Sequence, residues 1–164
     1  SFSREQAMQA VSYYREYYEE KGMFENEVYP GIKQLLRDLI KQGVLCLVAT
    51  SKPEIYAKKI LDYYELSNYF YYIAGANMDG TRTDKAEVIA YALKQIPAEY
   101  SNKKVLMVGD RSHDIIGAKK NGIDCAGVLF GYGSREELEE AGADFVADSV
   151  EAVRNIVFLN AAKN

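Results

Sequence analysis

The chain has 164 residues, of which 48% are hydrophobic and 27% are charged, and its formal net charge is -4. This length and composition fit one globular domain and exclude a disordered or fibrous protein. The negative charge argues against nucleic acid as the main partner, and no apolar run is long enough to span a bilayer. The first residues lack the apolar core of a signal peptide, so we expect a cytoplasmic protein. Cys46 and Cys125 lie in apolar runs and are expected to be buried, reduced thiols.

The N-terminal segment is predicted to be a helix. Ser3 and Gln6 stand at the two positions of a capping box, and the helix should run to about Lys21 and end at Gly22. Four tyrosines recur within it at helical spacing and predict a packing face: Tyr13, Tyr14, Tyr17 and Tyr18. The pattern of the chain changes after this segment, so we expect residues 1–28 to be structurally distinct from residues 29–164.

From residue 29 onward, helices alternate with short apolar strands. Helices are predicted at residues 32–42, 53–64, 84–95, 113–120, 135–140 and 150–161. Strands are predicted at residues 44–49, 70–74, 105–108, 125–129 and 144–147. Continuously apolar strands between helices favour an α/β fold, a Rossmann-like three-layer arrangement in which helices cover both faces of a parallel sheet. In such sheets the chemistry lies just outside the carboxyl ends of the strands.

Two of these strand ends offer groups that could bind an anion. Thr50 and Ser51 follow the strand at 44–49 and precede a helix, where hydroxyl and backbone N–H groups can hold phosphate, although a simple helix cap is the alternative. Lys85 opens the helix at 84–95, where its charge opposes the helix dipole. An anion at the strand ends would explain a lysine there, and a solvated surface lysine is the alternative.

A third strand end carries two carboxylates, Asp110 and Asp114, in the segment V-G-D-R-S-H-D. Side chains at this spacing across a strand-to-helix turn can face one Mg²⁺ ion, which proteins hold with one or two carboxylates plus phosphate and water. Helix capping is the alternative interpretation. His113 is the one histidine and has no cysteine or second histidine nearby in sequence, so a surface or supporting role is expected for it.

Taken together, T-S-K-P at 50–53, the lysine that opens a later helix, and V-G-D-R-S-H-D at 108–114 resemble motifs two, three and four of the haloacid dehalogenase-like (HAD) hydrolase superfamily. Other segments resemble its phosphoglycolate phosphatase-like branch: Y-P-G at 29–31, D-K-A-E-V-I at 84–89 and G-Y-G-S at 131–134. The resemblance to the α/β core covers residues 29–164. Residues 1–28 resemble the C-terminal part of that branch's helical cap domain.

The resemblance implies a role for each motif residue. Thr50, with help from Ser51, would hydrogen-bond phosphoryl oxygens, and Lys85 would neutralise their charge. Asp110 would bind Mg²⁺ directly, and Asp114 would join it directly or through water. The implied activity is Mg²⁺-dependent hydrolysis of a small phosphorylated metabolite. Phosphoglycolate, a nucleotide and a sugar phosphate all remain open as substrates, and a phosphoglucomutase-like transfer is the alternative reaction.

One element of the family pattern is not found in the sequence. The family's nucleophile is the first aspartate of a D-x-D loop after the first, central strand, and the 164 residues contain no D-x-D. The nearest segment, N-M-D-G-T at 77–81, comes after Thr50 and just before Lys85, so its match to the nucleophile loop is a coincidence. We therefore expect the nucleophile upstream of residue 1, a core at 29–164 without its first strand, and a chain that folds poorly alone as the C-terminal part of a longer protein.

Two alternative functions remain. A non-catalytic descendant could bind phosphate or a partner protein, but a scaffold has no need for the threonine, the lysine and both aspartates. A receiver-type signalling domain also places Asp, Thr and Lys at strand ends. It would have its acidic pair first and its lysine last, which is the reverse of the order here.

Overall fold

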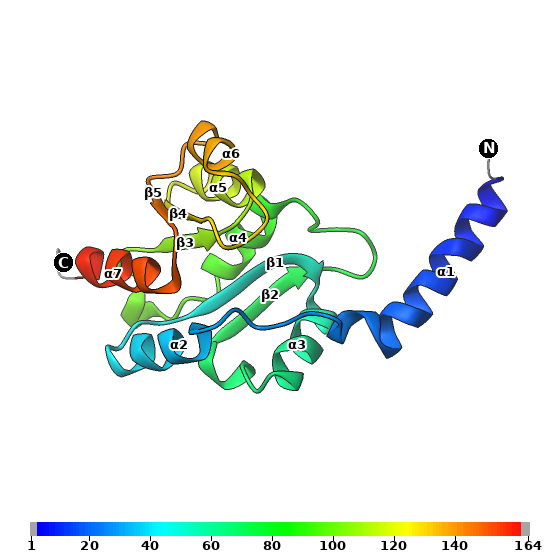
Figure 1. Cartoon of the computed structure of the whole chain (residues 1–164), viewed down its shortest axis with the longest axis horizontal. Coiled ribbons are helices and arrows are strands. Elements are labelled where there is room, and N and C mark those ends of the chain that lie inside the picture. The colour runs from blue at the N-terminus through cyan, green and yellow to red at the C-terminus, as the bar shows by residue number, and fades with distance from the viewer. Residues whose placement is uncertain (1–2, 162–164) are drawn as a thin grey trace.

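The structure, a computed structural model that describes residues 3–161, has parallel strands packed between helices (Figure 1). The helices are α1 (Arg4–Glu20), α2 (Ile32–Lys41), α3 (Glu54–Tyr63), α4 (Lys85–Leu93), α5 (Ser112–Lys120), α6 (Arg135–Glu140) and α7 (Val150–Ala161). Short 3-10 helices lie at Gly22–Phe24, Ser67–Tyr69 and Ala98–Tyr100. The strands are β1 (Leu47–Pro53), β2 (Tyr72–Ala76), β3 (Leu106–Gly109), β4 (Asp124–Val128) and β5 (Phe145–Ala147). The predicted α/β fold is confirmed.

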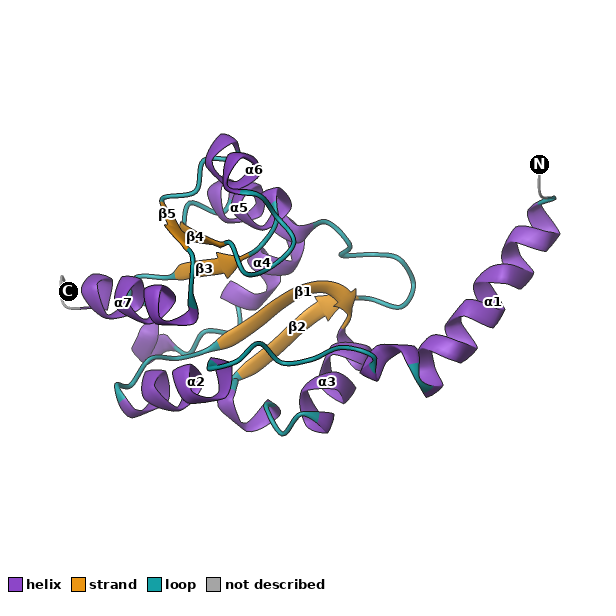
Figure 2. Ribbon diagram, in the orientation of Figure 1, coloured by secondary structure: helices purple, strands orange, loops and turns teal. Residues whose placement is uncertain are grey.

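The strands form two sheets, where the sequence pattern suggested one. The first sheet has the order β1-β2 and the second has the order β3-β4-β5, and all pairs are parallel (Figure 2). Within residues 3–161, β1 and β3 do not pair with each other. The side chain of Val108 in β3 is consequently exposed, at 39%, although a strand inside a covered parallel sheet is normally buried on both faces.

The core lies on both faces of β4. Cys125 packs with Ile115 and Leu138 from α5 and α6. Val128, whose side chain points to the opposite face, packs with Leu39 of α2 and with α7. Helices therefore cover both sides of β4, which explains why the strand is apolar from Cys125 to Val128, after the exposed Asp124 at its start. Both cysteines are free. Cys125 is buried as predicted, whereas Cys46 is only partly buried, and burial raises the pKa of each thiol.

Helix α1 begins as predicted, but its tyrosines do not pack as predicted. The Ser3 hydroxyl accepts the Gln6 N–H at 3.1 Å and the Gln6 side chain accepts the Ser3 N–H at 2.9 Å, so the capping box is present. The prediction of a tyrosine packing face is wrong for the described residues: Tyr13 and Tyr14 are each 63% exposed. The reason is that α1 projects away from the sheets (Figure 1). Tyr18, near the end of α1, does pack edge-to-face on Tyr56 of α3.

Strand β1 starts later and ends later than residues 44–49. Its first paired residue is Leu47, opposite Tyr72, because β2 begins there and a strand needs a partner. It then continues to Pro53, with an irregular register between Ala49 and Pro53, and α3 begins directly afterwards at Glu54. Among residues 3–161, none of the helices has the length and apolar character needed to cross a membrane.

We predict that Leu138→Ala lowers the free energy of unfolding by about 2 to 5 kcal/mol, the usual cost of a cavity in a packed core. Leu138 is fully buried between α6 and β4. The control is Leu159→Ala, because Leu159 is 66% exposed and its truncation should change stability by no more than about 0.5 kcal/mol. Urea denaturation followed by circular dichroism measures both, and equal effects would contradict this assignment of the core.

Candidate active site

A buried lysine connects the ends of the two sheets. Lys85 Nζ donates to the carbonyl oxygen of Ala49 in β1 at 2.9 Å and forms an ion pair with Asp114 Oδ1 at 2.8 Å. The side chains of Lys85 and Asp114 are only 10% and 5% exposed. A charge taken out of water in this way needs a close partner of opposite sign, and each of these two groups supplies it for the other.

The backbone that carries Lys85 is held by helix packing. Asp84 caps α4 by accepting the Ala86 N–H at 2.8 Å. Asn121, the residue directly after α5, donates from Nδ2 to the Ala86 carbonyl at 3.0 Å, which ties the end of α5 to the start of α4. A Cβ atom at Gly117 would lie 3.0 Å from Lys85 Cγ, so the two helices approach closely where the lysine leaves α4. The lysine is therefore placed by α4 and α5 together.

Asp114 organises the loop between β3 and α5. Its Oδ2 accepts the backbone N–H groups of Asp110 and Arg111, at 3.0 and 3.1 Å, while its Oδ1 faces Lys85. A Cβ atom at Gly109 would lie 2.3 Å from Asp114 Cβ, so only glycine fits at that position. Both oxygens of Asp114 are thus engaged by the protein itself.

Asp110 has a different environment. Its Oδ2 accepts the Tyr132 N–H at 2.9 Å, and its backbone carbonyl accepts the Gly133 N–H at 2.8 Å. No hydrogen bond to its Oδ1 occurs within residues 3–161, so this oxygen can face a cation. The donor set fits Mg²⁺, a hard cation that takes one or two carboxylates and completes its shell with phosphate and water. No cluster of three or more potential metal-ligating side chains occurs among the described residues, so the phosphate or another segment has to complete such a site.

Thr50 is adjacent in sequence to the residue that Lys85 contacts. It follows Ala49, whose carbonyl binds Lys85, and its Oγ1 accepts the Lys52 N–H at 3.2 Å. The irregular register of β1 falls on this segment, and such bulges are common beside active sites. The first turn of α3 carries Glu54, which already supplies negative charge at that helix end. Thr50 and the adjoining Ser51 are therefore better placed to bind an anion than the α3 terminus itself.

The segment N-M-D-G-T forms a closed turn after β2. The Asn77 N–H donates to the Thr81 carbonyl at 3.1 Å, and Asn77 Nδ2 donates to Thr81 Oγ1 at 2.8 Å. Asp79 accepts the Thr81 N–H at 2.9 Å, and the hydrogen bonds from Thr81 lower the pKa of that carboxyl. These bonds explain the sequence of the segment without catalysis, in agreement with its interpretation as a coincidence.

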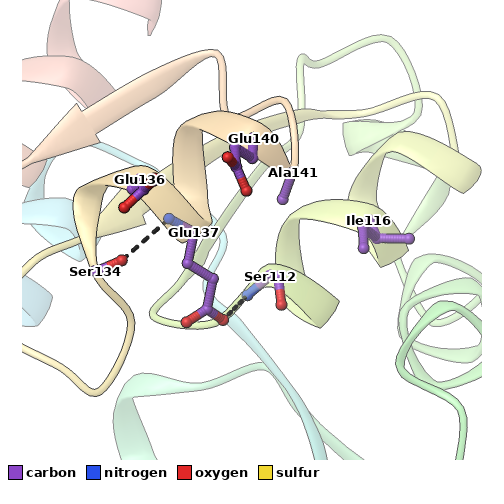
Figure 3. A pocket seen from close by; sticks show the side chains of 7 residues that line it. All are labelled: Ser112, Ile116, Ser134, Glu136, Glu137, Glu140 and Ala141. Carbon is purple, nitrogen blue, oxygen red and sulfur yellow. Dashed lines mark hydrogen bonds between the residues drawn. The ribbon is translucent and has the colours of Figure 1, made fainter.

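The sequence reasoning missed one residue beside the site, Glu137 of α6. Its Oε1 accepts the Ser112 N–H at 2.8 Å and the Arg111 Nε–H at 3.0 Å, and Figure 3 shows the side chain reaching from α6 to the start of α5. The Ser112 N–H and then the Arg111 guanidinium lower the pKa of Glu137 to about 2. No local pattern marks it, because the segment R-E-E-L-E-E reads as an ordinary exposed acidic helix.

A cavity between α5 and α6 is the wrong place for a phosphate. Glu136, Glu137 and Glu140 all line it (Figure 3), and three carboxylates repel an anion. His113 lies at the surface beside the buried Lys85–Asp114 pair: its side chain is 55% exposed, and its Nε2 is 3.9 Å from Asp114 Oδ1. The candidate active site therefore remains at the strand ends, around Lys85 and Asp110.

A sequence model of the haloacid dehalogenase-like hydrolases matches residues 1–128. The chain is 38% identical over 158 residues to a 5'-nucleotidase of Pseudomonas aeruginosa, covering 95% of this chain and 70% of that protein. The chain belongs to the haloacid dehalogenase-like hydrolase family.

Other relatives are named for different activities. A phosphoglycolate phosphatase of Vibrio cholerae is 27% identical and matches 97% of this chain and 70% of its own length, which supports the resemblance to that branch. The tyrosine-protein kinase PtkA of Mycobacterium tuberculosis is 40% identical over 142 residues, 87% of this chain, but the match spans only 48% of the kinase. A predicted phosphatase from Clostridium acetobutylicum has a crystal structure that matches with a TM-score of 0.84 at 43% identity, over 96% of this chain and 72% of that one.

We predict that Lys85→Met lowers the free energy of unfolding by about 3 kcal/mol, because it leaves the buried Asp114 carboxylate without a cation. The double variant Lys85→Met/Asp114→Asn should recover part of this loss, since the uncompensated charge is then gone. Chemical denaturation at pH 7 gives the free energies of unfolding, and from them the coupling free energy between Lys85 and Asp114. Strictly additive effects would show that the two side chains do not interact in solution.

We predict a distinct pH dependence for Glu137→Gln. The folded-state pKa of Glu137 is about 2, below its ordinary value of 4.5, so its contribution to stability is complete above about pH 4.5 and declines as the pH falls toward 2. The stability difference between the wild type and this variant should be constant from pH 7 to about 4.5 and shrink below that. Denaturation curves at a series of pH values test it, and a difference that grows on acidification would contradict it.

Proposed function

We propose that this chain forms part of a Mg²⁺-dependent phosphatase that hydrolyses a small phosphomonoester. The observation that carries the proposal is the buried Lys85 ammonium, which contacts the Ala49 carbonyl and the Asp114 carboxylate. Thr50 directly follows Ala49 in the chain, and Asp110 donates its backbone N–H to Asp114. A cation and a hydroxyl can bind phosphoryl oxygens, and a free carboxylate oxygen can hold the Mg²⁺ ion that accompanies them. The family, and the two relatives named as a 5'-nucleotidase and a phosphoglycolate phosphatase, support the same reaction class.

The residues divide the work according to their surroundings. Thr50 and Ser51 donate hydrogen bonds to phosphoryl oxygens, and Lys85 offsets the negative charge that these oxygens carry. Asp110 presents its Oδ1 to the cation, while Asp114 holds Lys85 and the backbone of the Asp110 loop in place. When bound, Mg²⁺ would supply further charge stabilisation for the phosphoryl group.

The nucleophile, in this proposal, is an aspartate upstream of residue 1 that forms an aspartyl-phosphate intermediate. The pairing of the strands supports this: β1 pairs only with β2 and β3 only with β4 within residues 3–161, so each could accept one further parallel neighbour. A strand between them would end beside Lys85 and Thr50. We likewise propose that residues 1–28 are the end of a cap domain over a core at residues 29–164.

The substrate class rests on the relatives. The 38% identity to a 5'-nucleotidase favours a nucleoside 5′-monophosphate over phosphoglycolate, whose phosphatase is 27% identical. Transfer of the phosphoryl group to an acceptor other than water is the second candidate, because a tyrosine kinase is 40% identical over part of its length. A phosphoglucomutase-like transfer belongs to this second candidate.

We predict that Asp110→Asn abolishes Mg²⁺-dependent turnover in the complete protein while leaving it folded. The amide can still accept the Tyr132 N–H, but it loses the charge that attracts the cation. The control is Asp124→Asn, the same change at an exposed position at the start of β4. Because β3 and β4 are parallel, Asp124 lies at the opposite edge of the sheet from Asp110, which follows the end of β3. Hydrolysis of p-nitrophenyl phosphate and of nucleoside monophosphates measures the effect, and full activity in Asp110→Asn would refute the metal assignment.

A further inference from the structure

The loop that carries Asp110 is held from outside by a segment that follows β4. We define this clamp segment as residues 131–137, which include the start of α6. Its backbone contacts Asp110 twice, through the Tyr132 N–H to Oδ2 and the Gly133 N–H to the carbonyl oxygen. A Cβ atom at Gly131 would lie 2.3 Å from Asp110 Cβ, so the two segments are in direct contact. The clamp segment thus surrounds the residue to which we assign the cation.

The third contact of the clamp segment is the side chain of Glu137. One carboxylate oxygen, Oε1, accepts both the Ser112 N–H at 2.8 Å and the Arg111 Nε–H at 3.0 Å. Arg111 and Ser112 lie between Asp110 and Asp114, so Glu137 binds the middle of the segment that the two aspartates flank. Figure 3 shows that Glu137 leaves α6 toward α5 while its own N–H is bonded to Ser134.

The backbone that carries Glu137 is held in place by a helix cap and by core packing. The Ser134 hydroxyl caps α6 by accepting the Glu137 N–H at 3.1 Å, and the next residue, Leu138, is fully buried against β4. A carboxylate on a fixed backbone that accepts two N–H donors can define the position of the donors. The neighbouring Glu136 and Glu140 line the same cavity, but no hydrogen bond or ion pair from either to the loop occurs among the described residues.

We propose that Glu137 is a positioning residue for the cation site: by fixing Arg111 and Ser112, it sets the direction in which the free Asp110 oxygen points. The proposal rests on the proposed function, since it concerns the same cation. Groups that orient a metal ligand from outside typically change metal affinity by about 10- to 100-fold when they are removed. Glu137 touches no substrate atom in this assignment, so its loss should affect cation binding more than turnover at saturating Mg²⁺.

The experiment compares Glu137→Ala, Glu137→Gln and the control Glu140→Gln in the complete protein. We expect Glu137→Ala to raise the Mg²⁺ concentration for half-maximal activity about tenfold, with kcat at saturating Mg²⁺ close to that of the wild type. Glu137→Gln keeps an oxygen that can accept the Ser112 N–H, so it should show a smaller increase. Glu140→Gln should match the wild type, and all three variants should remain folded at the assay temperature.

A second measurement does not depend on activity. Amide hydrogen exchange, read by NMR without Mg²⁺, should be faster at Ser112 and Arg111 in Glu137→Ala than in Glu140→Gln. Unchanged Mg²⁺ dependence together with unchanged exchange in a folded Glu137→Ala protein would overturn the proposal. A wild-type protein with no phosphatase activity would instead refute the proposed function, and the exchange comparison would still decide whether Glu137 holds the loop.

Discussion

The buried Lys85 ammonium is the constraint around which the rest of the molecule is arranged. Within the described residues the two sheets share no backbone hydrogen bond, yet Lys85 contacts the β1 carbonyl of Ala49 and the Asp114 carboxylate after β3. A cation this deeply placed is stable only if its partners are fixed and close. The packing of α4 against α5 meets that requirement, because it places the start of one helix against the side of the other.

The same constraint gives the two aspartates different roles. Asp114 accepts two backbone N–H groups and faces Lys85, so both of its oxygens are committed to the protein. Asp110 has one oxygen that faces no donor among residues 3–161. Asp114 therefore holds the loop in place and Asp110 is the candidate cation ligand. The two side chains are chemically identical, so the difference arises from their neighbours.

The relatives of this chain are named for more than one activity. Proteins named as a 5'-nucleotidase, a phosphoglycolate phosphatase and a tyrosine kinase each match most of this chain. A shared fold does not fix the substrate, which depends on the groups that surround the site. The residues at the strand ends support handling of a phosphoryl group, while the choice of acceptor and leaving group has to come from groups outside this cluster.

The sequence by itself determined the alternation of helices and strands, the order of the motifs and the identity of Thr50, Lys85, Asp110 and Asp114 as candidates, because these depend on local periodicity and on where strands end. It also located the capping box of α1 and the range of α6. Its errors came from contacts between distant segments: the limits of β1 depend on where β2 begins, and the α1 tyrosines face no core in the described chain.

Only the tertiary structure showed that both oxygens of Asp114 have partners in the protein, that Lys85 contacts both sheets and that Glu137 holds the loop from α6. These facts depend on the packing of α4, α5 and α6, which brings together residues as far apart in the chain as Ala49 and Asp114, or Ser112 and Glu137. Periodicity specifies which face of a helix is buried, but a single hydrogen bond between two helices depends on their relative position. That position is set by the whole core, so no local pattern in the sequence could reveal it.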